Sequence, residues 1–309
     1  MNKKRIIVAN PHGFCSGVSR AVDAIQAAIK KYPPPVYCYH EVVHNQQVAD
    51  MLTKQGVVFV ESLDGIPHGS ALLLSAHGVA PEVRHMAQAK DLLVIDATCP
   101  FVARAHAKVK RLAARGCSIL LIGHRNHEEV IGVAAEAPEH VTVIENENEA
   151  RTVRPPHPEA IGVVTQTTLS VRFVDTMIAI LRERFPRLDA PQKGDICYAT
   201  QNRQLAVEQL ANQCDGTLVL GSRNSSNSLR LTEIAQSQGK PAFLLSTRAD
   251  LNAVDLSGIH TLGLTSGAST PEFFLEAMID DLKRFGFTEK SSLSVSTEST
   301  RSFPLPKLP

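Results

Sequence analysis

The stretch LLVIDATCPFVARAHAKVKRLAARG, residues 92–116, has the order of a parallel α/β unit. Its first five residues, LLVID, form an apolar run that is typical of a buried β-strand. The short turn ATCP follows, and residues 101–116 then have the spacing of an amphipathic helix that ends at Gly116. Cys99 is therefore expected where a helix begins, directly after a strand.

Two other cysteines have a similar place in the pattern. The run IIVA, residues 6–9, leads through NPHGFCSG, which contains Cys15, into a helix expected to begin near Val18. Cys197 lies in GDICYAT, just before the helical stretch NRQLAVEQLANQ, although no clear strand precedes it. The three cysteines are 84 and 98 residues apart, which is about the length of one small domain each.

Two further strand-to-helix turns follow each cysteine, and their distances from the cysteine along the chain are similar. The first turn lies 29, 28 and 28 residues after its cysteine, at His44, His127 and Ser225. The second turn of each set lies near His77, Thr167 and Ser269. Regular spacing of this kind indicates internal repetition.

The repetition predicts an α/β fold of three similar units, each with a small, mostly parallel sheet. We place the units at residues 1–98, 99–193 and 194–287, and expect a pseudo-threefold arrangement around a common centre. Parallel sheets bind ligands at the carboxyl ends of their strands, so the three sets of turns would face one centre. Residues 288–309, rich in Ser, Thr and Pro from residue 291 onward, are expected to form a disordered tail.

Composition excludes several classes of function. The chain has 309 residues and a formal net charge of +1, with no block of like charges, so we expect no nucleic-acid partner. Its apolar runs are too short for a membrane span, and no signal-peptide core follows the basic first residues, so we expect no membrane partner. Six widely spaced cysteines in such a chain are expected to be reduced thiols of a cytoplasmic protein.

Cys15, Cys99 and Cys197, one per unit, would form a soft sulfur donor set. Such a set suits an iron–sulfur cluster or zinc, and helix starts favour the thiolate form. With three thiol ligands, a four-iron cluster would keep one iron open to a substrate oxygen, and this iron would act as a Lewis acid. The other cysteines are interpreted as small buried apolar residues; they are Cys38, Cys117 and Cys214.

The side chains in the turns suit a diphosphate, because helix N-termini, hydroxyls and imidazoles can bind phosphate without a lysine cradle. Neither a P-loop nor a dinucleotide-binding glycine motif is present. Taken singly, each of the serines and threonines is more often a helix cap than a ligand. The candidates are His44, His77, His127, Thr167, Thr168, Ser225, Ser226, Asn227 and Ser269.

Chemistry on a substrate oxygen bound to such an iron would also require a proton donor. Glu129 is the candidate donor, because a carboxylic acid in a closed pocket can stay protonated near neutrality, and Glu128 is its immediate rival. A different chemistry is suggested by His40, Glu41 and His44, which spell the zinc-hydrolase motif H-E-x-x-H. That motif needs a helix, and here the valines that follow VYCY favour a strand end or a turn.

Eight motifs, in the same order, resemble those of the 4-hydroxy-3-methylbut-2-enyl diphosphate reductase (LytB/IspH) family. They are NPHGFCSGV, HEVVHN, SAHGV, DATCP, TQTTLS, DICYATQNRQ, GSRNSSNS and TSGAS, and the resemblance covers about residues 6–285. It implies an iron–sulfur oxidoreductase that converts (E)-4-hydroxy-3-methylbut-2-enyl diphosphate to isopentenyl and dimethylallyl diphosphate. This is the last step of the non-mevalonate (MEP/DXP) isoprenoid pathway, and electrons would arrive singly from a ferredoxin or a flavodoxin.

The resemblance also implies roles for individual residues. Cys15, Cys99 and Cys197 would ligate one 4Fe–4S cluster with one open iron. Glu129, His127 and Thr168 would be catalytic, with His127 and Thr168 near the hydroxyl-bearing carbon, Thr167 beside them and Glu129 supplying protons. The implied diphosphate ligands are His44, His77, Ser225, Ser226, Asn227 and Ser269.

The sequence departs from the family at Glu128, where H-P-E is usual and this chain has H-E-E. The departure puts in doubt the rigidity of the loop and the acidity of Glu129, since a neighbouring carboxylate tends to raise a pKa. It also motivates a non-enzymatic alternative, a redox or metabolite sensor on the same fold.

Overall fold

The computed structural model describes residues 4–191, 195–295 and 302–309. The chain divides into two compact parts. The terminal part contains Met1–Ser19, His44–Asp50 and Tyr198–Ser302, and the central part contains Arg20–Val43, Met51–Cys197 and Phe303–Pro309. Two helices, α1 (Ser16–Lys31) and α2 (Gln46–Thr53), have residues in both parts.

A five-stranded, all-parallel sheet forms the centre of the terminal part, in the order β10-β9-β11-β1-β12. Its strands are β1 (Lys4–Asn10), β9 (Gly216–Leu220), β10 (Ala242–Leu245), β11 (Thr261–Ser266) and β12 (Phe287–Ser294). Its helices are α8 (Tyr198–Gln213), α9 (Ser226–Gln236) and α10 (Glu272–Leu282), with the short 3-10 helices η1 (Arg248–Ala253) and η2 (Lys283–Phe285).

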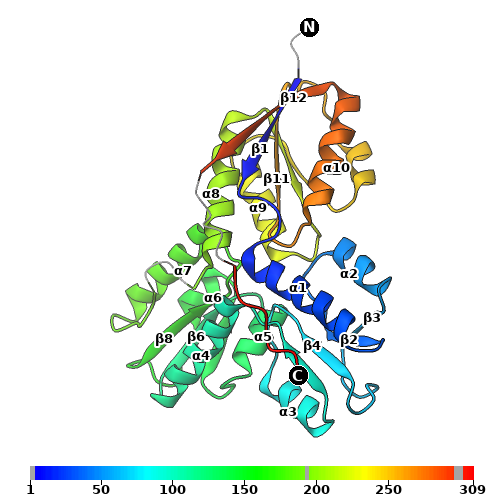
Figure 1. Cartoon of the computed structure of the whole chain (residues 1–309). Coiled ribbons are helices and arrows are strands. Elements are labelled where there is room, and N and C mark those ends of the chain that lie inside the picture. The colour runs from blue at the N-terminus through cyan, green and yellow to red at the C-terminus, as the bar shows by residue number, and fades with distance from the viewer. Residues whose placement is uncertain (1–3, 192–194, 296–301) are drawn as a thin grey trace. The chain divides into compact units, whose positions relative to one another are not determined.

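Both faces of this sheet are covered, and the apolar runs explain why. In β1, Ile6 and Val8 pack in one core with α10, whereas Ile7 and Ala9 pack in another with α8. Alternate residues of a strand point to opposite faces, so a continuous apolar run has apolar side chains on both. Figure 1 shows α10 on one side of the sheet and α8 on the other.

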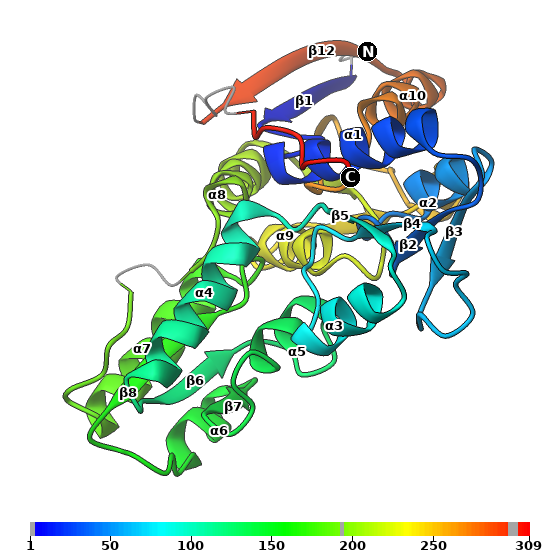
Figure 2. The ribbon, with the colours of Figure 1, turned by 60° about the horizontal axis from the view of Figure 1, so that its bottom comes forward.

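The central part contains two smaller parallel sheets, in the orders β3-β2-β4-β5 and β7-β6-β8. The first sheet consists of β2 (Val36–Tyr39), β3 (Val57–Val60), β4 (Ala71–Leu74) and β5 (Leu93–Asp96), and α3 (Pro81–Ala89) connects β4 to β5. The second consists of β6 (Ser118–Ile122), β7 (Val141–Ile144) and β8 (Ile161–Thr165), with helices α4 (Pro100–Ala114), α5 (Glu128–Ala134), α6 (Glu147–Thr152) and α7 (Val171–Arg184). Figure 2 shows α4 running along β6 and β8.

The three small parallel sheets confirm the predicted α/β fold, and they share one strand order. Counted along the chain from β2, β6 or β9, the first three strands of each sheet lie side by side in the order second, first, third. In two of the sheets a fourth strand, β1 or β5, lies beside the third. In the sheet of β6, β7 and β8, the described residues fill this fourth place with a single bridge, from Asp189 to Gly162. The unclear strand before Cys197 in the sequence therefore corresponds to a single bridged residue.

β1 lies in a different sheet from the one we expected. It pairs with β11 and β12, not with the strands of residues 36–96. Each cysteine-bearing turn thus follows the fourth place in the order of one sheet, which is β1, β5 or the bridged residue Asp189. The first residues of the chain belong to the sheet formed near its end. Sequence position alone conceals this, because the paired strands β1 and β11 are about 250 residues apart.

The prediction that residues 288–309 are disordered is wrong for the part that the structure describes. Residues 287–294 form β12, which pairs with β1 from Lys4 opposite Phe287 to Asn10 opposite Ser294. A backbone ladder along an otherwise unpaired edge does not need an apolar sequence, and most side chains of β12 are exposed. Residues 296–301 lie outside the described residues.

The last residues, 303–309, bind to α1 within the central part. Arg20 donates from Nε to the carbonyl oxygen of Pro304 at 2.9 Å, and Lys31 donates to that of Leu308 at 3.1 Å. The ring of Phe303 meets that of Phe101 edge to face. Cations of α1 and one aromatic pair thus hold a segment whose composition suggested disorder.

Within the described ranges, every helix is too short or too polar to span a lipid bilayer.

Candidate functional site

The three candidate ligand cysteines have the same local structure. Each is the residue immediately before a helix, at the starts of α1, α4 and α8. Each also donates its backbone N–H to a carbonyl in the turn after a neighbouring strand. These bonds are Cys15 to Ala268 at 3.1 Å, Cys99 to Ala76 at 3.0 Å and Cys197 to Thr167 at 3.2 Å.

Exposure separates these three cysteines from the rest. Cys15, Cys99 and Cys197 are partly exposed, whereas the other three cysteines are buried. Burial raises the pKa of Cys38, and it raises that of Cys214 to about 11, so both stay neutral thiols. The interpretation of Cys38, Cys117 and Cys214 as small buried residues is confirmed.

The other candidates divide between the two parts of the chain. The terminal part holds Cys15, His44, Ser225, Ser226, Asn227 and Ser269, and the central part holds Cys99, Cys197, His77, His127, Glu128, Glu129, Thr167 and Thr168.

In the terminal part, the turns after β9 and β11 pack against Ser228. A Cβ atom at Gly221 or Gly267 would lie 2.2 or 2.1 Å from the Ser228 hydroxyl, so both positions require glycine. Ser225 caps α9 by accepting from the Ser228 N–H at 3.3 Å. The close packing places Ser225 and its successors beside the turn that leads to Ser269.

Asn227, in the same region, has a buried side-chain amide without hydrogen bonds. The residue is 5% exposed, and neither its amide nitrogen nor its amide oxygen has a hydrogen-bond partner among the described residues. Buried polar atoms rarely lack a hydrogen-bond partner, because removing such an atom from water without a partner costs about 1–3 kcal/mol. An unsatisfied side chain at the start of a helix is suited to a ligand.

His44 and Ser269 are also brought together. The Ser269 hydroxyl donates to the His44 carbonyl oxygen at 2.9 Å, and the Ser222 hydroxyl accepts from the Gln46 N–H at 3.1 Å. These bonds tie the segment of residues 44–50 to the turns of the terminal sheet.

In the central part, Glu129 is held from two sides. It is 2% exposed, and its two carboxylate oxygens accept from the Thr167 N–H at 2.7 Å and the Thr167 hydroxyl at 2.9 Å. His127, the N-cap of α5, accepts from the Glu129 N–H at 3.2 Å. The structure therefore brings together three residues that the sequence placed in two separate turns.

Glu128, the residue that departs from the family pattern, points to another group. Its carboxylate lies 2.8 Å from Nδ1 of His77, and the ring of His77 meets that of His127 edge to face at 6.0 Å. Gly78 follows His77 with φ +76°, and a Cβ there would lie 2.7 Å from Nε2 of His106. Only glycine therefore permits this turn to pack on His106.

The H-E-x-x-H motif does not form a zinc site of the hydrolase type. Residues 40–45 have no helical structure, and His40 follows β2 with φ +59°. The expectation of a strand end is confirmed, and the zinc-hydrolase interpretation loses the helix that its geometry requires.

Two structural residues were missed in the sequence. Gln166, 1% exposed, joins two turns by donating to the Thr168 hydroxyl at 2.9 Å and accepting from the His124 N–H at 3.1 Å. Arg203, 0% exposed, donates to the carbonyl of Gly13 at 3.0 Å and so supports the loop before Cys15. Both lie inside motifs that we recognised, but only their contacts reveal what they do.

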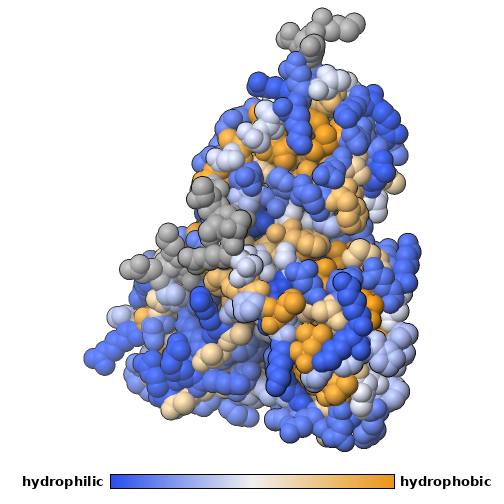
Figure 3. Space-filling model, viewed as in Figure 1, coloured by the Kyte–Doolittle hydropathy of each residue, from blue (hydrophilic) through white to orange (hydrophobic). Residues whose placement is uncertain are grey.

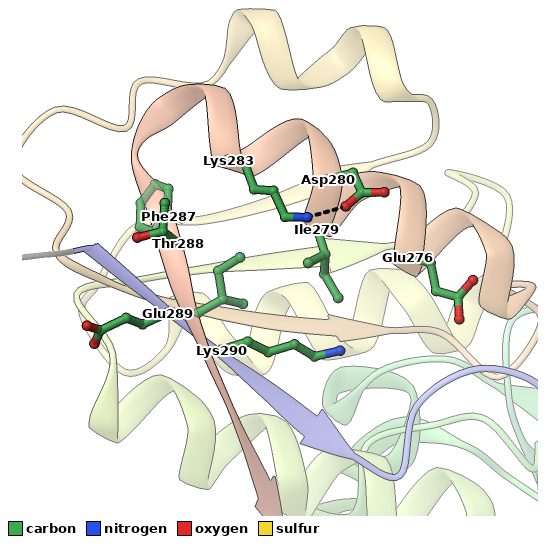
Figure 4. A pocket seen from close by; sticks show the side chains of 9 residues that line it. Glu276, Ile279, Asp280, Lys283, Phe287, Thr288, Glu289 and Lys290 are labelled. Carbon is green, nitrogen blue, oxygen red and sulfur yellow. Dashed lines mark hydrogen bonds and ion pairs between the residues drawn. The ribbon is translucent and has the colours of Figure 1, made fainter.

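A hollow of about 400 Å³ lies elsewhere in the terminal part, between β1, α10 and β12 (Figure 4). Its lining mixes apolar residues such as Ile279 and Phe287 with charged ones such as Glu289 and Lys290, and Lys283 is already paired with Asp280 at 2.7 Å. Figure 3 shows apolar side chains gathered between β1 and α10 in this region. None of the candidate residues lines this hollow.

The fold and the turns define a class: an α/β protein whose partly exposed cysteines and ligand-type turns lie at the carboxyl ends of parallel strands. The model of the family described as LytB protein matches residues 6–283. A 4-hydroxy-3-methylbut-2-enyl diphosphate reductase of Rhodococcus jostii is 45% identical over 306 residues, which are 99% of this chain and 91% of the relative.

Two solved structures are also similar. The E-1-hydroxy-2-methyl-but-2-enyl-4-diphosphate reductase of Plasmodium falciparum has a TM-score of 0.95 and 38% identity, covering 98% of this chain and 96% of that one. A second, described as the terminal enzyme of the non-mevalonate pathway, has a TM-score of 0.65 and 29% identity, covering 91% of this chain and 99% of that one.

The chain belongs to the LytB family of iron–sulfur oxidoreductases. The local structure fits such a group, because thiolate sulfur is the usual ligand of iron–sulfur clusters and three partly exposed cysteines precede helices.

Proposed function

We propose that this chain reduces (E)-4-hydroxy-3-methylbut-2-enyl diphosphate to isopentenyl and dimethylallyl diphosphate, the last step of the non-mevalonate pathway. One observation carries the proposal: three partly exposed cysteines have equivalent places, each before a helix and each tied through its N–H to the turn of a neighbouring strand. Family membership and the names of the relatives support the same conclusion.

Cys15, Cys99 and Cys197 would hold one 4Fe–4S cluster in a pseudo-threefold site, with one iron free of protein ligands. When bound, the cluster would supply electrons and a Lewis-acidic iron for the substrate hydroxyl. The overall reaction breaks the C–O bond and forms a C–H bond, and it consumes two electrons and two protons as water leaves. Because the electrons enter singly, a ferredoxin or a flavodoxin in the cytoplasm is the proposed donor.

The residues of the turns would bind the diphosphate. His44, Ser225, Ser226, Asn227 and Ser269 from the terminal part, with His77 from the central part, are the proposed ligands. The unsatisfied amide of Asn227 and the start of α9 offer donors that suit phosphate oxygens.

Glu129 would deliver protons, with His127 and Thr168 near the reacting carbon. Thr167 fixes the Glu129 carboxylate by two bonds, and His127 accepts from the Glu129 N–H, so the acid has one defined orientation. A positioned carboxyl group contributes about 10²–10⁴-fold to a rate that depends on proton transfer.

The proposed function is tested with protein purified and assayed without oxygen. We expect a brown protein that contains iron and acid-labile sulfide and that, with dithionite and a mediator dye, converts the hydroxylated diphosphate to the two products, detected by mass spectrometry. A protein that binds no iron after reconstitution, or that carries the cluster but leaves the substrate unchanged, would contradict the proposal. The second outcome would favour the sensor.

Replacing Asn227 by alanine separates binding from stability. We expect the KM for substrate to rise about tenfold, because donors to a charged ligand are lost, while thermal stability without ligand stays equal or rises, because an unsatisfied buried amide is removed. Asn146, whose side chain caps α6, is the matched control. Asn146→Ala should lower stability by about 1 kcal/mol and leave KM unchanged. Equal losses of stability in both variants would show that Asn227 is merely structural.

A further inference from the structure

A basic side chain supports the loop before each of the three candidate ligand cysteines. Each of these side chains donates to a group one or two residues before its cysteine. The pairs are Arg20 with the Thr98 carbonyl at 3.0 Å, Lys108 with the Asp195 carboxylate at 2.9 Å, and Arg203 with the Gly13 carbonyl at 3.0 Å. The basic residues lie in α1, α4 and α8, the helices that follow Cys15, Cys99 and Cys197. Each cation thus comes from the helix after one cysteine and supports the loop before another.

The backbone of these loops is fixed by a repeated pair of hydrogen bonds. The N–H of each cysteine donates to a carbonyl in the turn after a neighbouring strand, as described above. In each case the N–H two residues earlier donates to the residue that lies two positions before that acceptor. These bonds join Gly13 to the Ser266 hydroxyl at 2.7 Å, Ala97 to the Leu74 carbonyl at 3.0 Å, and Asp195 to the Thr165 hydroxyl at 2.8 Å. The loops therefore share one register, and each cation is added to the same backbone frame.

Arg20 donates from all three nitrogens of its guanidinium group. Nη1 and Nη2 donate to the carbonyls of Thr98 and Asp96 at 3.0 and 3.3 Å, and Nε donates to that of Pro304 at 2.9 Å. The peptide group between Thr98 and Cys99 is thereby bonded at both ends, since its N–H is bonded to the turn after β4. A peptide group is planar, so bonds at both ends fix its orientation and, with it, the backbone of Cys99.

Lys108 acts through a side chain of the loop. Its ammonium group bonds both carboxylate oxygens of Asp195, and one of these oxygens also accepts from the Thr165 N–H at 3.1 Å. The side chains of Lys108 and Asp195 are 16% and 23% exposed, and ion pairs shielded from water are stronger than exposed ones. The Asp195 carboxylate therefore ties the loop before Cys197 to α4 on one side and to β8 on the other.

We propose that Arg20, Lys108 and Arg203 are positioning residues: each holds the loop before one ligand cysteine in place, so that the site is ordered before iron binds. The inference rests on the proposed function, in which the three cysteines ligate the cluster. It deepens that function, because it identifies side chains outside the ligand set that control how firmly the cluster is held.

Fixing these loops in advance favours metal binding. A mobile loop loses conformational entropy when its cysteine becomes a ligand, whereas a loop already held by hydrogen bonds loses less. Residues that orient metal ligands contribute about 10–100-fold to metal affinity or activity. Arginine and lysine suit this role, because hydrogen bonds from a charged donor are stronger than those between neutral groups.

The test measures iron release from the reconstituted holoenzyme without oxygen. An excess of a strong chelator is added, and loss of the cluster is followed by its visible absorbance. We expect Arg20→Met, Lys108→Met and Arg203→Met to release iron about tenfold faster than the parent chain, because methionine keeps an unbranched side chain but has no N–H donor. Lys108→Arg should stay within about twofold of the parent, since a guanidinium group can still bond both oxygens of Asp195. Arg203 is 0% exposed, so if its variant does not fold, the other two still decide the inference.

Arg184 supplies the matched control. Like Arg20, it lies in a helix of the central part and donates to two backbone carbonyls, those of Ala150 and Val153, each at 2.6 Å. These acceptors belong to α6 and its end, which contain none of the candidate ligands. Arg184→Met should lower the melting temperature of the apoprotein about as much as Arg20→Met, but should leave iron release within about twofold of the parent.

The outcomes distinguish the inference from the function on which it rests. Unchanged iron release in Arg20→Met and Lys108→Met, with an active parent, would overturn the positioning role and leave the function intact. Equally fast release from Arg184→Met would show that lost stability sets the rate, and would also overturn the inference. An iron-loaded parent that leaves the substrate unchanged would contradict the function, while the release rates would still decide the inference. A parent that takes up no iron would contradict both.

Discussion

Cys99→Ser will yield a folded protein that no longer holds its iron–sulfur cluster. Serine keeps the size of the side chain but replaces a soft thiolate by a hard oxygen, which is a poor ligand for such a cluster. Substitutions next to metal ligands already cost about 10–100-fold in metal affinity or activity, so we expect at least about a hundredfold loss of turnover. The visible absorbance of the cluster and the iron content should fall together with the activity.

A buried cysteine supplies the matched control for this experiment. Cys117 is 6% exposed and packs in the core beside α4. Cys117→Ala should keep the iron content and the turnover of the parent and lose only a little thermal stability. If Cys99→Ser retained the full cluster spectrum while Cys117→Ala lost it, the assignment of ligands would be wrong.

The second large effect is expected at Glu129. Glu129→Gln should lower kcat by about 10²–10⁴-fold with little change in KM, because the amide keeps the shape of the side chain but cannot deliver a proton. Folding should tolerate it: the amide oxygen can accept from the Thr167 N–H, and the amide nitrogen can donate to the Thr167 hydroxyl. Single-turnover assays and the cluster spectrum would separate a lost proton donor from a lost cofactor.

Glu136 is the control for Glu129, since it is also a buried carboxylate of the central part. Its side chain is 6% exposed and pairs with His106 at 2.7 Å. Glu136→Gln should reduce stability and leave kcat within a few-fold. A similar fall of kcat in both variants would mean that Glu129 acts through the fold and not as an acid.

Much of the architecture could be predicted from local patterns. Apolar runs mark the strands β1 to β11, which are four to seven residues long, and the helices α1, α4 and α8 begin directly after the three cysteines. Repeated spacing indicated three sheets, and three all-parallel sheets are present. These features depend on neighbours in the chain, which sequence displays directly.

Partners far apart in the chain could not be predicted in the same way. The tail pairs as β12 with β1, although its side chains are mostly polar, because the interaction uses backbone groups that every residue has. The pairing of Glu128 with His77 was also missed; we had expected Glu128 to act on the acidity of its neighbour Glu129.

By itself, the sequence determined which residues could carry the chemistry, since thiols before helices and polar turns after apolar strands are local patterns. The tertiary structure decided which of them are available and in what state. It buried three cysteines and left three partly exposed, fixed Glu129 on Thr167, and gave the Asn227 amide no partner within the described part of the chain. Burial and hydrogen-bond satisfaction depend on segments brought together from distant positions, and no local stretch of sequence contains that information.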